Sequence, residues 1–106
     1  MNSLEDLQEE VDSFINNYEE GYWPPLSMLA ALVEEVGELS RELNDEFGSK
    51  PKKDLKEKGD IRNELGDTLF SLICIANYLD IDLESALEST MEKYRDRDSD
   101  RWTEIK

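Results

Sequence analysis

The stretch from Leu65 to Leu79 constrains the fold most, because it carries a single charged residue, Asp67, among mostly apolar ones. Together with the residues from Asp60 onward, its apolar positions recur at helical spacing and cover most of the circumference of the predicted helix. A helix that is apolar on most sides is normally buried on most sides. The chain is therefore predicted to be all-α, with this helix inside a bundle.

A narrow polar seam runs along this predicted helix. Its members are Asp60, Glu64, Asp67, Ser71 and Tyr78. A solvent-exposed face would normally carry lysines, arginines and several glutamates, which this seam does not. Buried carboxylates cost free energy unless they are paired or bound to metal. The seam therefore indicates a functional site.

A second helix is predicted from Leu26 to Phe47, with Gly48 as its C-terminal stop. One side of it is an apolar stripe made of Leu29, Leu32, Val33, Val36, Leu39, Leu43 and Phe47. The opposite side carries the acids Glu34, Glu35, Glu38, Glu42 and Asp45. Taken alone, this acidic side is interpreted as a solvated face.

Acids spaced three residues apart occur in both helices, as Glu35 with Glu38 and Glu64 with Asp67. Each pair shares one helix face. Four carboxylates from two facing helices form a set of hard oxygen ligands, which suits Mg²⁺ or Mn²⁺. The chain has no histidine, so it lacks the commonest general base and the Glu-x-x-His pairs of di-iron bundles.

The remaining segments are predicted from local signals. An amphipathic helix is expected over about residues 3–19, with Ser3 as its N-cap and Pro24 and Pro25 ending it. A fourth helix follows Asp80 or Asp82 and runs to residue 98. The lysine-rich residues 49–59 are either a solubilising loop or a lid over an anionic substrate.

Three further features can be interpreted in more than one way, and the sequence decides only for the cysteine. Trp23, beside Tyr22, is either a base-stacking platform or a hydrophobic plug. Lys93 and Arg97 share a helix face and either bind phosphate oxygens or pair with surplus acids. Cys74 lies among apolar residues and is interpreted as a buried structural thiol.

Composition limits the classes of partner. The chain of 106 residues is expected to form one domain, 1–106, and its 38% hydrophobic content favours helices that share buried surface across subunits. The net charge of −15 repels nucleic-acid polymers and anionic membranes. No apolar run approaches membrane-spanning length, and the single cysteine fits a reducing cytoplasm.

The acidic pattern resembles a known family signature. Glu34-Glu35-x-x-Glu38 followed by Glu64-x-x-Asp67 is similar to the EExxE…ExxD motif of the MazG nucleotide pyrophosphohydrolases. The resemblance extends to residues 21–25 before the first motif and 93–97 after the second, and covers about residues 20–102. It implies a four- to five-helix MazG-like bundle completed by oligomerisation, as a homodimer or homotetramer.

The resemblance also implies a function. The family hydrolyses nucleoside triphosphates to monophosphate and pyrophosphate with Mg²⁺, in some cases to clean the nucleotide pool. Carried over by position, the metal ligands are Glu35, Glu38, Glu64 and Asp67, the supporting or water-orienting carboxylate is Glu34, and the phosphate contacts are Lys93 and Arg97. The resemblance does not identify the base-contacting residues; the first helix and the Trp23 region are expected to help enclose the base, and Trp23 and Tyr78 are the candidates for the substrate pocket. The alternative function is a non-catalytic acidic helical interaction module.

Overall fold

The computed structural model describes residues 2–48 and 60–105, so the lysine-rich segment 49–59 lies outside the described residues. The described residues form four helices and no strand: α1 (Leu4–Ile15), α2 (Pro25–Phe47), α3 (Ile61–Tyr78) and α4 (Leu83–Asp98). The all-α prediction is confirmed.

Side chains that cap backbone N–H groups fix where three helices begin. Ser3 and Asp6 form a reciprocal capping box at the start of α1, with both hydrogen bonds 3.1 Å long. The Asp60 carboxylate accepts two backbone N–H groups at the start of α3. Of the two predicted caps for α4, Asp82 is the residue that accepts a backbone N–H, and Asp80 instead adopts a positive φ of 57° in the preceding turn.

The prediction for the end of the first helix is wrong by about four residues. The helix ends at Ile15, because the chain tightens there into a turn in which the Tyr18 N–H donates to the Ile15 carbonyl. Gly21 then takes a φ of +61°, which glycine adopts without steric cost. Pro24 and Pro25 do not end α1; they start α2, where proline fits the first turn.

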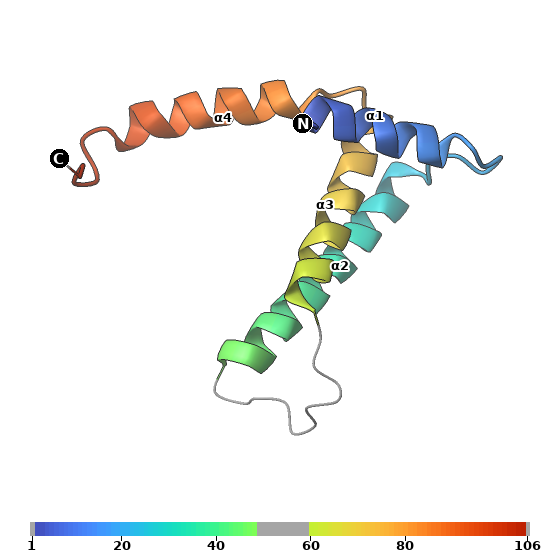
Figure 1. Cartoon of the computed structure of the whole chain (residues 1–106), viewed down its shortest axis with the longest axis horizontal. Helices are drawn as coiled ribbons and strands as arrows, with labels where there is room; N and C mark the ends of the chain where they lie inside the picture. Colours follow the sequence, from blue (N-terminus) through green and yellow to red (C-terminus); the bar gives the residue numbers. More distant parts are fainter. Residues whose placement is uncertain (1, 49–59, 106) are drawn as a thin grey trace.

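The helices form an open arrangement (Figure 1). α2 and α3 lie side by side and antiparallel, α1 crosses one end of this pair, and α4 projects away from it. The buried apolar side chains belong to α2 and α3, near the end that α1 crosses: Met28, Ile73, Cys74 and Ala76. The expectation that Cys74 is a buried thiol is confirmed.

α2 turns part of its acidic side toward α3 and leaves most of its apolar stripe exposed. Glu42 is only 6% exposed and Glu35 is half-buried, whereas Val33 is 62% exposed and Phe47 is 75% exposed. The interpretation of the acidic side as a solvated face is therefore wrong for Glu35 and Glu42. Glu35 of α2 meets Glu64 and Asp67 of the polar seam of α3. Leu32 and Leu39 are the members of the apolar stripe that are half-buried, and the other members are exposed.

The single chain leaves much apolar surface uncovered. Its radius of gyration is 17.6 Å, against about 13 Å expected for a compact chain of this length. Its accessible surface is 8939 Å², against about 6100 Å² expected for a folded monomer of its mass. α3 is not buried on most sides within this chain, since Leu65, Leu69 and Leu72 are exposed. Among the described residues, no helix has the length and apolar character needed to cross a membrane.

Candidate metal centre

Three carboxylates converge where α2 and α3 face each other. Glu35 of α2 and Glu64 and Asp67 of α3 each offer an oxygen, and these oxygens lie within 4.8 Å of one another. Glu35 and Glu64 are half-buried and Asp67 is exposed, so the group opens to solvent on one side. Within residues 2–48 and 60–105, it is the one group of at least three acids or cysteines this close together. We refer to it as the carboxylate trio.

Local structure brings the trio together. Asp60 caps α3 four residues before Glu64, and the three-residue spacing then puts Asp67 on the same helix face. The Thr68 hydroxyl donates to the Glu64 carbonyl over 2.7 Å, so the polar side chain beside the trio is satisfied by the helix backbone. The antiparallel packing of α2 supplies Glu35 from the other side.

The charges around Glu64 oppose its ionisation. Partial burial is the largest cause that raises the pKa of Glu64, and repulsion from Glu38, Glu35, Asp67 and Glu42 raises it further. Glu38 is thus close enough to act on the trio electrostatically although it is not a member. A cation among these groups would reverse the effect, because it favours the ionised carboxylates.

Two oxygens of the trio have no hydrogen-bonding partner in the described part of the chain. Glu35 Oε2 and Glu64 Oε2 are both buried and accept no hydrogen bond there. Burial of an unsatisfied carboxylate oxygen is costly. A hard divalent cation would satisfy both atoms, and a set of carboxylate oxygens open to solvent fits Mg²⁺ or Mn²⁺, which bind carboxylates together with water and phosphate.

The two other predicted carboxylates of α2 lie outside the trio. Glu38 is exposed, and its charge nevertheless contributes to the raised pKa of Glu64. Glu34 is exposed as well and is not among the charges that raise that pKa. The single chain therefore brings Glu35, Glu64 and Asp67 together, places Glu38 nearby and leaves Glu34 at the surface.

A mainly apolar cavity of about 350 Å³ adjoins Glu35. It is lined by the loop between α1 and α2 and by parts of α1, α2 and α3, including Tyr22, Trp23, Met28, Phe70 and Cys74. Trp23 is 59% exposed, so it does not act as a buried plug in this chain, whereas Tyr22 is half-buried. Tyr78, the last residue of α3, is exposed and does not line this cavity.

The predicted phosphate-binding cations lie on α4. The Lys93 ammonium and the Arg97 guanidinium lie 5.2 Å and 4.4 Å from the centre of the Tyr94 ring. Arg97 Nε also donates to Asp98 Oδ1 over 2.9 Å, and this hydrogen bond raises the pKa of Arg97. Within one chain, Arg97 is therefore paired with an acid, which is one of the two alternatives that the sequence left open. Because α4 projects away from α2 and α3 (Figure 1), one chain does not bring these cations to the trio.

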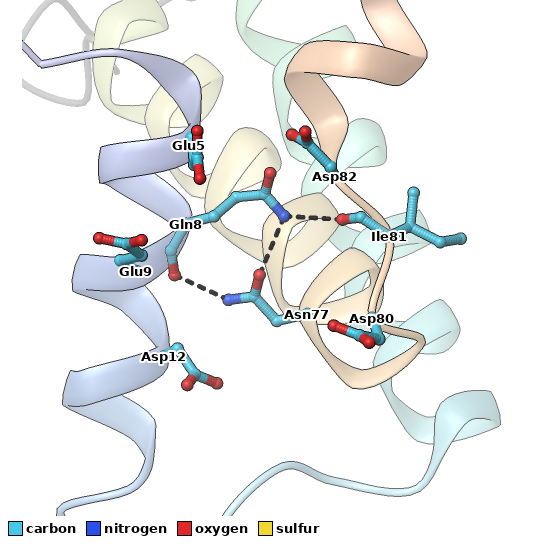
Figure 2. Close-up of a pocket in the computed structure, with 8 residues that line it drawn as sticks. All are labelled: Glu5, Gln8, Glu9, Asp12, Asn77, Asp80, Ile81 and Asp82. Atoms are coloured by element: carbon cyan, nitrogen blue, oxygen red, sulfur yellow. Dashed lines mark hydrogen bonds between the residues drawn. The ribbon is translucent and has the colours of Figure 1, made fainter.

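A buried polar network at the junction of α1, α3 and α4 was not foreseen from the sequence. Figure 2 shows its centre, where Gln8 Nε2 donates to Asn77 Oδ1 and to the Ile81 carbonyl over 3.0 Å and 2.9 Å. The Leu83 N–H donates in turn to Gln8 Oε1 over 2.8 Å. Five acids surround the cavity beside it, and no three of them converge as the trio does: Glu5, Glu9, Asp12, Asp80 and Asp82.

One sequence signal could have revealed this network. Gln8 lies on the apolar side of α1, three residues before Val11 and four after Leu4, and it is only 7% exposed. A polar residue at such a position needs hydrogen-bonding partners inside the fold. The sequence could not identify the hydrogen-bonding partners of Gln8, since Asn77 is 69 residues away.

Relatives of known structure share this fold. The chain aligns with the crystal structure of YpjD from Bacillus subtilis, described as a candidate pyrophosphatase, at 47% identity and a TM-score of 0.82, over 89% of this chain and 96% of that one. A second crystal structure, of a Bacillus-conserved MazG protein described as a nucleotide pyrophosphohydrolase, aligns at 46% identity and a TM-score of 0.78, over 95% of this chain and 98% of that one.

Sequence relatives agree with the structural ones. The uncharacterised protein YpjD of Bacillus subtilis strain 168 is 50% identical over 101 residues, which are 95% of this chain and 91% of YpjD. The nucleoside triphosphate pyrophosphohydrolase/pyrophosphatase MazG of Thermotoga maritima is 34% identical over 82 residues, which are 70% of this chain but 32% of that longer protein.

The family model of the MazG nucleotide pyrophosphohydrolase domain matches residues 24–102. This match covers most of the chain and includes all three helices, α2 to α4, that carry the predicted motifs. The chain therefore belongs to the MazG nucleotide pyrophosphohydrolase family, and it is a hydrolase that acts on phosphoric anhydrides.

Proposed function

We propose that this protein hydrolyses a nucleoside triphosphate, ribo or deoxy, to the monophosphate and pyrophosphate with Mg²⁺ or Mn²⁺ as cofactor. The observation that carries the proposal is the trio of Glu35, Glu64 and Asp67, with its two unsatisfied buried oxygens. An acidic interaction module without chemistry would account for the charge of the chain. It would give those two oxygens no role.

The chain's own acids have separate roles in this proposal. Glu35, Glu38, Glu64 and Asp67 hold the cofactor between α2 and α3. A bound divalent cation would neutralise phosphate charge and make water a better nucleophile. Glu34, exposed beside Glu35 in the sequence, would orient that water and accept its proton. No histidine is needed for this chemistry.

The cavity beside Glu35 is suited to the nucleoside part of the substrate. Its lining is mainly apolar, and the flat, accessible ring of Trp23 offers a stacking surface for a base. Tyr78, which lies outside the cavity in one chain, is proposed as a more distant contact. The site would thus bind the triphosphate at the trio and the base against the loop before α2.

The active form is proposed to be a homodimer or homotetramer. The exposed apolar side of α2 and the exposed leucines of α3 are surfaces that a second copy would cover. Lys93 and Arg97 on the projecting α4 would then contact the phosphates at a site completed by more than one chain. We further propose a cytoplasmic protein that binds no nucleic-acid polymer and that cleans the nucleotide pool.

The test is a pyrophosphate-release assay over canonical and damaged NTPs and dNTPs, with Mg²⁺, Mn²⁺ or EDTA. We expect metal-dependent release from at least one nucleotide, with the monophosphate as co-product. Absence of release across the whole panel would favour the interaction module. Sedimentation at micromolar concentration tests the assembly, and a species of only 12.3 kDa would contradict it.

A further inference from the structure

Tyr22 lies between two cavities and is held at its hydroxyl end. Its ring lines the apolar cavity that adjoins Glu35. Its hydroxyl donates to Asp12 Oδ1 over 2.6 Å and accepts from Asn77 Nδ2 over 3.1 Å. Asp12 and Asn77 line the acidic cavity of Figure 2 and do not line the cavity beside Glu35. One side chain therefore joins the wall of the candidate substrate cavity to a polar network behind it.

The network behind Tyr22 is anchored on two helices. The Asn77 amide donates to the Gln8 carbonyl as well as to Tyr22, and it accepts from the Gln8 side chain. Figure 2 shows this reciprocal pair bridging α1 and the end of α3. Because Gln8 is nearly fully buried, the amide group that holds Tyr22 is itself fixed by the fold.

The residues on either side of Tyr22 are not part of a helix. Gly21, directly before it, has a positive φ, and Trp23, directly after it, is largely exposed. The described segment between α1 and α2 belongs to no helix or strand, and the Gly21 N–H in it donates to the Tyr18 carbonyl over 3.2 Å. The Tyr22 hydroxyl adds a side-chain anchor to this irregular stretch. Trp23 lines the same cavity as Glu35 and directly follows Tyr22, so its position is tied to the hydrogen bonds of Tyr22.

We propose that Tyr22 is a positioning residue for substrate selection: its hydroxyl, held by Asp12 and Asn77, fixes the loop that presents Trp23 to the nucleobase. This inference rests on the proposed function for the substrate, whereas the fixing of the loop does not. The hydroxyl touches no member of the trio, so its loss should weaken nucleotide binding and leave the chemical step unchanged.

The state of the hydroxyl is consistent with a permanent anchor. Burial, followed by the hydrogen bond to Asp12, raises the pKa of Tyr22 to about 12. The phenol therefore stays protonated, and remains a donor to Asp12, throughout the pH range in which nucleotide hydrolysis would be measured.

The first experiment replaces Tyr22 with Phe, which keeps the ring and removes both hydrogen bonds. Trp102→Phe provides the background, because Trp102 is the only other tryptophan. In the free protein we expect the time-resolved fluorescence anisotropy of Trp23 to decay further on the nanosecond timescale in Tyr22→Phe. With the best nucleotide of the panel, we expect KM to rise about tenfold, equivalent to about 1.4 kcal/mol, with kcat within about twofold of the parent.

Two controls separate positioning from general stability. Tyr18→Phe removes a hydroxyl from a neighbouring ring that is 58% exposed, and should change neither anisotropy nor KM. Asp12→Asn keeps an acceptor for the Tyr22 hydroxyl and should stay close to the parent. Asp12→Ala removes one of the two hydrogen bonds and should shift anisotropy and KM in the same direction as Tyr22→Phe, by a smaller amount.

The outcomes distinguish the two proposals. A lower melting temperature with unchanged Trp23 anisotropy and unchanged KM would overturn the inference and make Tyr22 a stabilising residue only. A fall in kcat at constant KM would overturn it as well, since it would place Tyr22 in the chemical step. If the parent protein released no pyrophosphate, the proposed function would fail, and the anisotropy experiment would still decide whether Tyr22 fixes the loop.

Discussion

The two sides of α2 differ in a way that reverses the usual amphipathic helix. The side with Glu35 and Glu42 is turned toward α3, while the side with Val33 and Phe47 faces solvent. In an ordinary surface helix the apolar side is buried and the acidic side is hydrated. Under the proposed function, the acidic side would serve a cation and the apolar side would serve a second copy of the chain. The four predictions below test the acidic side first, then the cations of α4 and last the apolar side.

The largest effect is expected on the acidic side. Glu64→Gln or Asp67→Asn should lower pyrophosphate release by more than about 100-fold, beyond the loss typical of residues that only support metal ligands. Helical circular dichroism should be retained, because neither change alters a helix cap. Glu46→Gln, an exposed acid of the same α2, is the matched control and should keep full activity. Equal activity in all three variants would show that the trio is not a metal site.

The second prediction concerns pH and metal removal. Because the pKa of Glu64 is raised, the folded protein binds more protons than the unfolded chain between the ordinary and the raised value. The stability cost is therefore absent in acid, grows as pH rises through that interval and is fully present above it. Melting temperature in EDTA should fall over this interval, and Glu64→Gln should raise it at neutral pH.

Metal should remove this cost. A cation that binds only the folded site stabilises it by about 2.7 kcal/mol at a hundredfold excess over its dissociation constant. The melting curves with EDTA and with Mg²⁺ should diverge toward neutral pH and converge in acid. Parallel curves over the whole range would mean that the acidic side of α2 is simply hydrated.

The third prediction asks whether the site extends beyond one chain. Arg97→Ala should raise the KM for nucleotide roughly tenfold, the scale of one charge-assisted hydrogen bond. It should leave metal affinity without nucleotide unchanged, because α4 is remote from the trio in this chain. Mixing Arg97→Ala protein with Glu64→Gln protein should restore part of the activity if the cations act on a neighbouring chain's site. Unchanged kinetics in Arg97→Ala would reduce the residue to its pairing with Asp98.

The smallest effect is expected at Gly37, which borders the apolar side of α2 one turn after Val33. A Cβ at Gly37 would meet no atom within 4 Å in this chain, so Gly37→Ala should stabilise an uncovered helix by about 1 kcal/mol. If the side is covered by a second copy, the added methyl group should weaken association at sedimentation equilibrium. A more stable protein with unchanged association would show that the partner does not lie over Gly37.

The helices and the trio could be predicted from the sequence because their signals are local. Caps such as Ser3 and Asp60 act within three residues, and the spacing of Glu64 and Asp67 determines that they share a face. Periodicity could not predict which other helix each face of a helix would pack against. The acidic side of α2 was interpreted as the solvated one, and the burial of Glu42 shows that part of it is covered by the fold.

Long-range polar contacts were beyond the reach of pattern reasoning. The bond between Gln8 and Asn77 and the bond between Tyr22 and Asn77 join residues 69 and 55 positions apart. Nothing in the spacing of single polar residues specifies such partners. The position of α4, and with it Lys93 and Arg97, likewise depends on tertiary contacts, which no motif encodes.

The exposure of α4 has a consequence for its local stability. None of its sixteen residues, all of them described, is buried, and an isolated helix of this length is marginal in water. Its amide hydrogens should therefore exchange quickly in a dilute single chain, while those of α2 and α3 exchange with the global unfolding of the protein. Slow exchange of the amide hydrogens of α4 would then show that a second copy of the chain covers this helix. Ordering of this helix would be the step at which Lys93 and Arg97 acquire fixed positions.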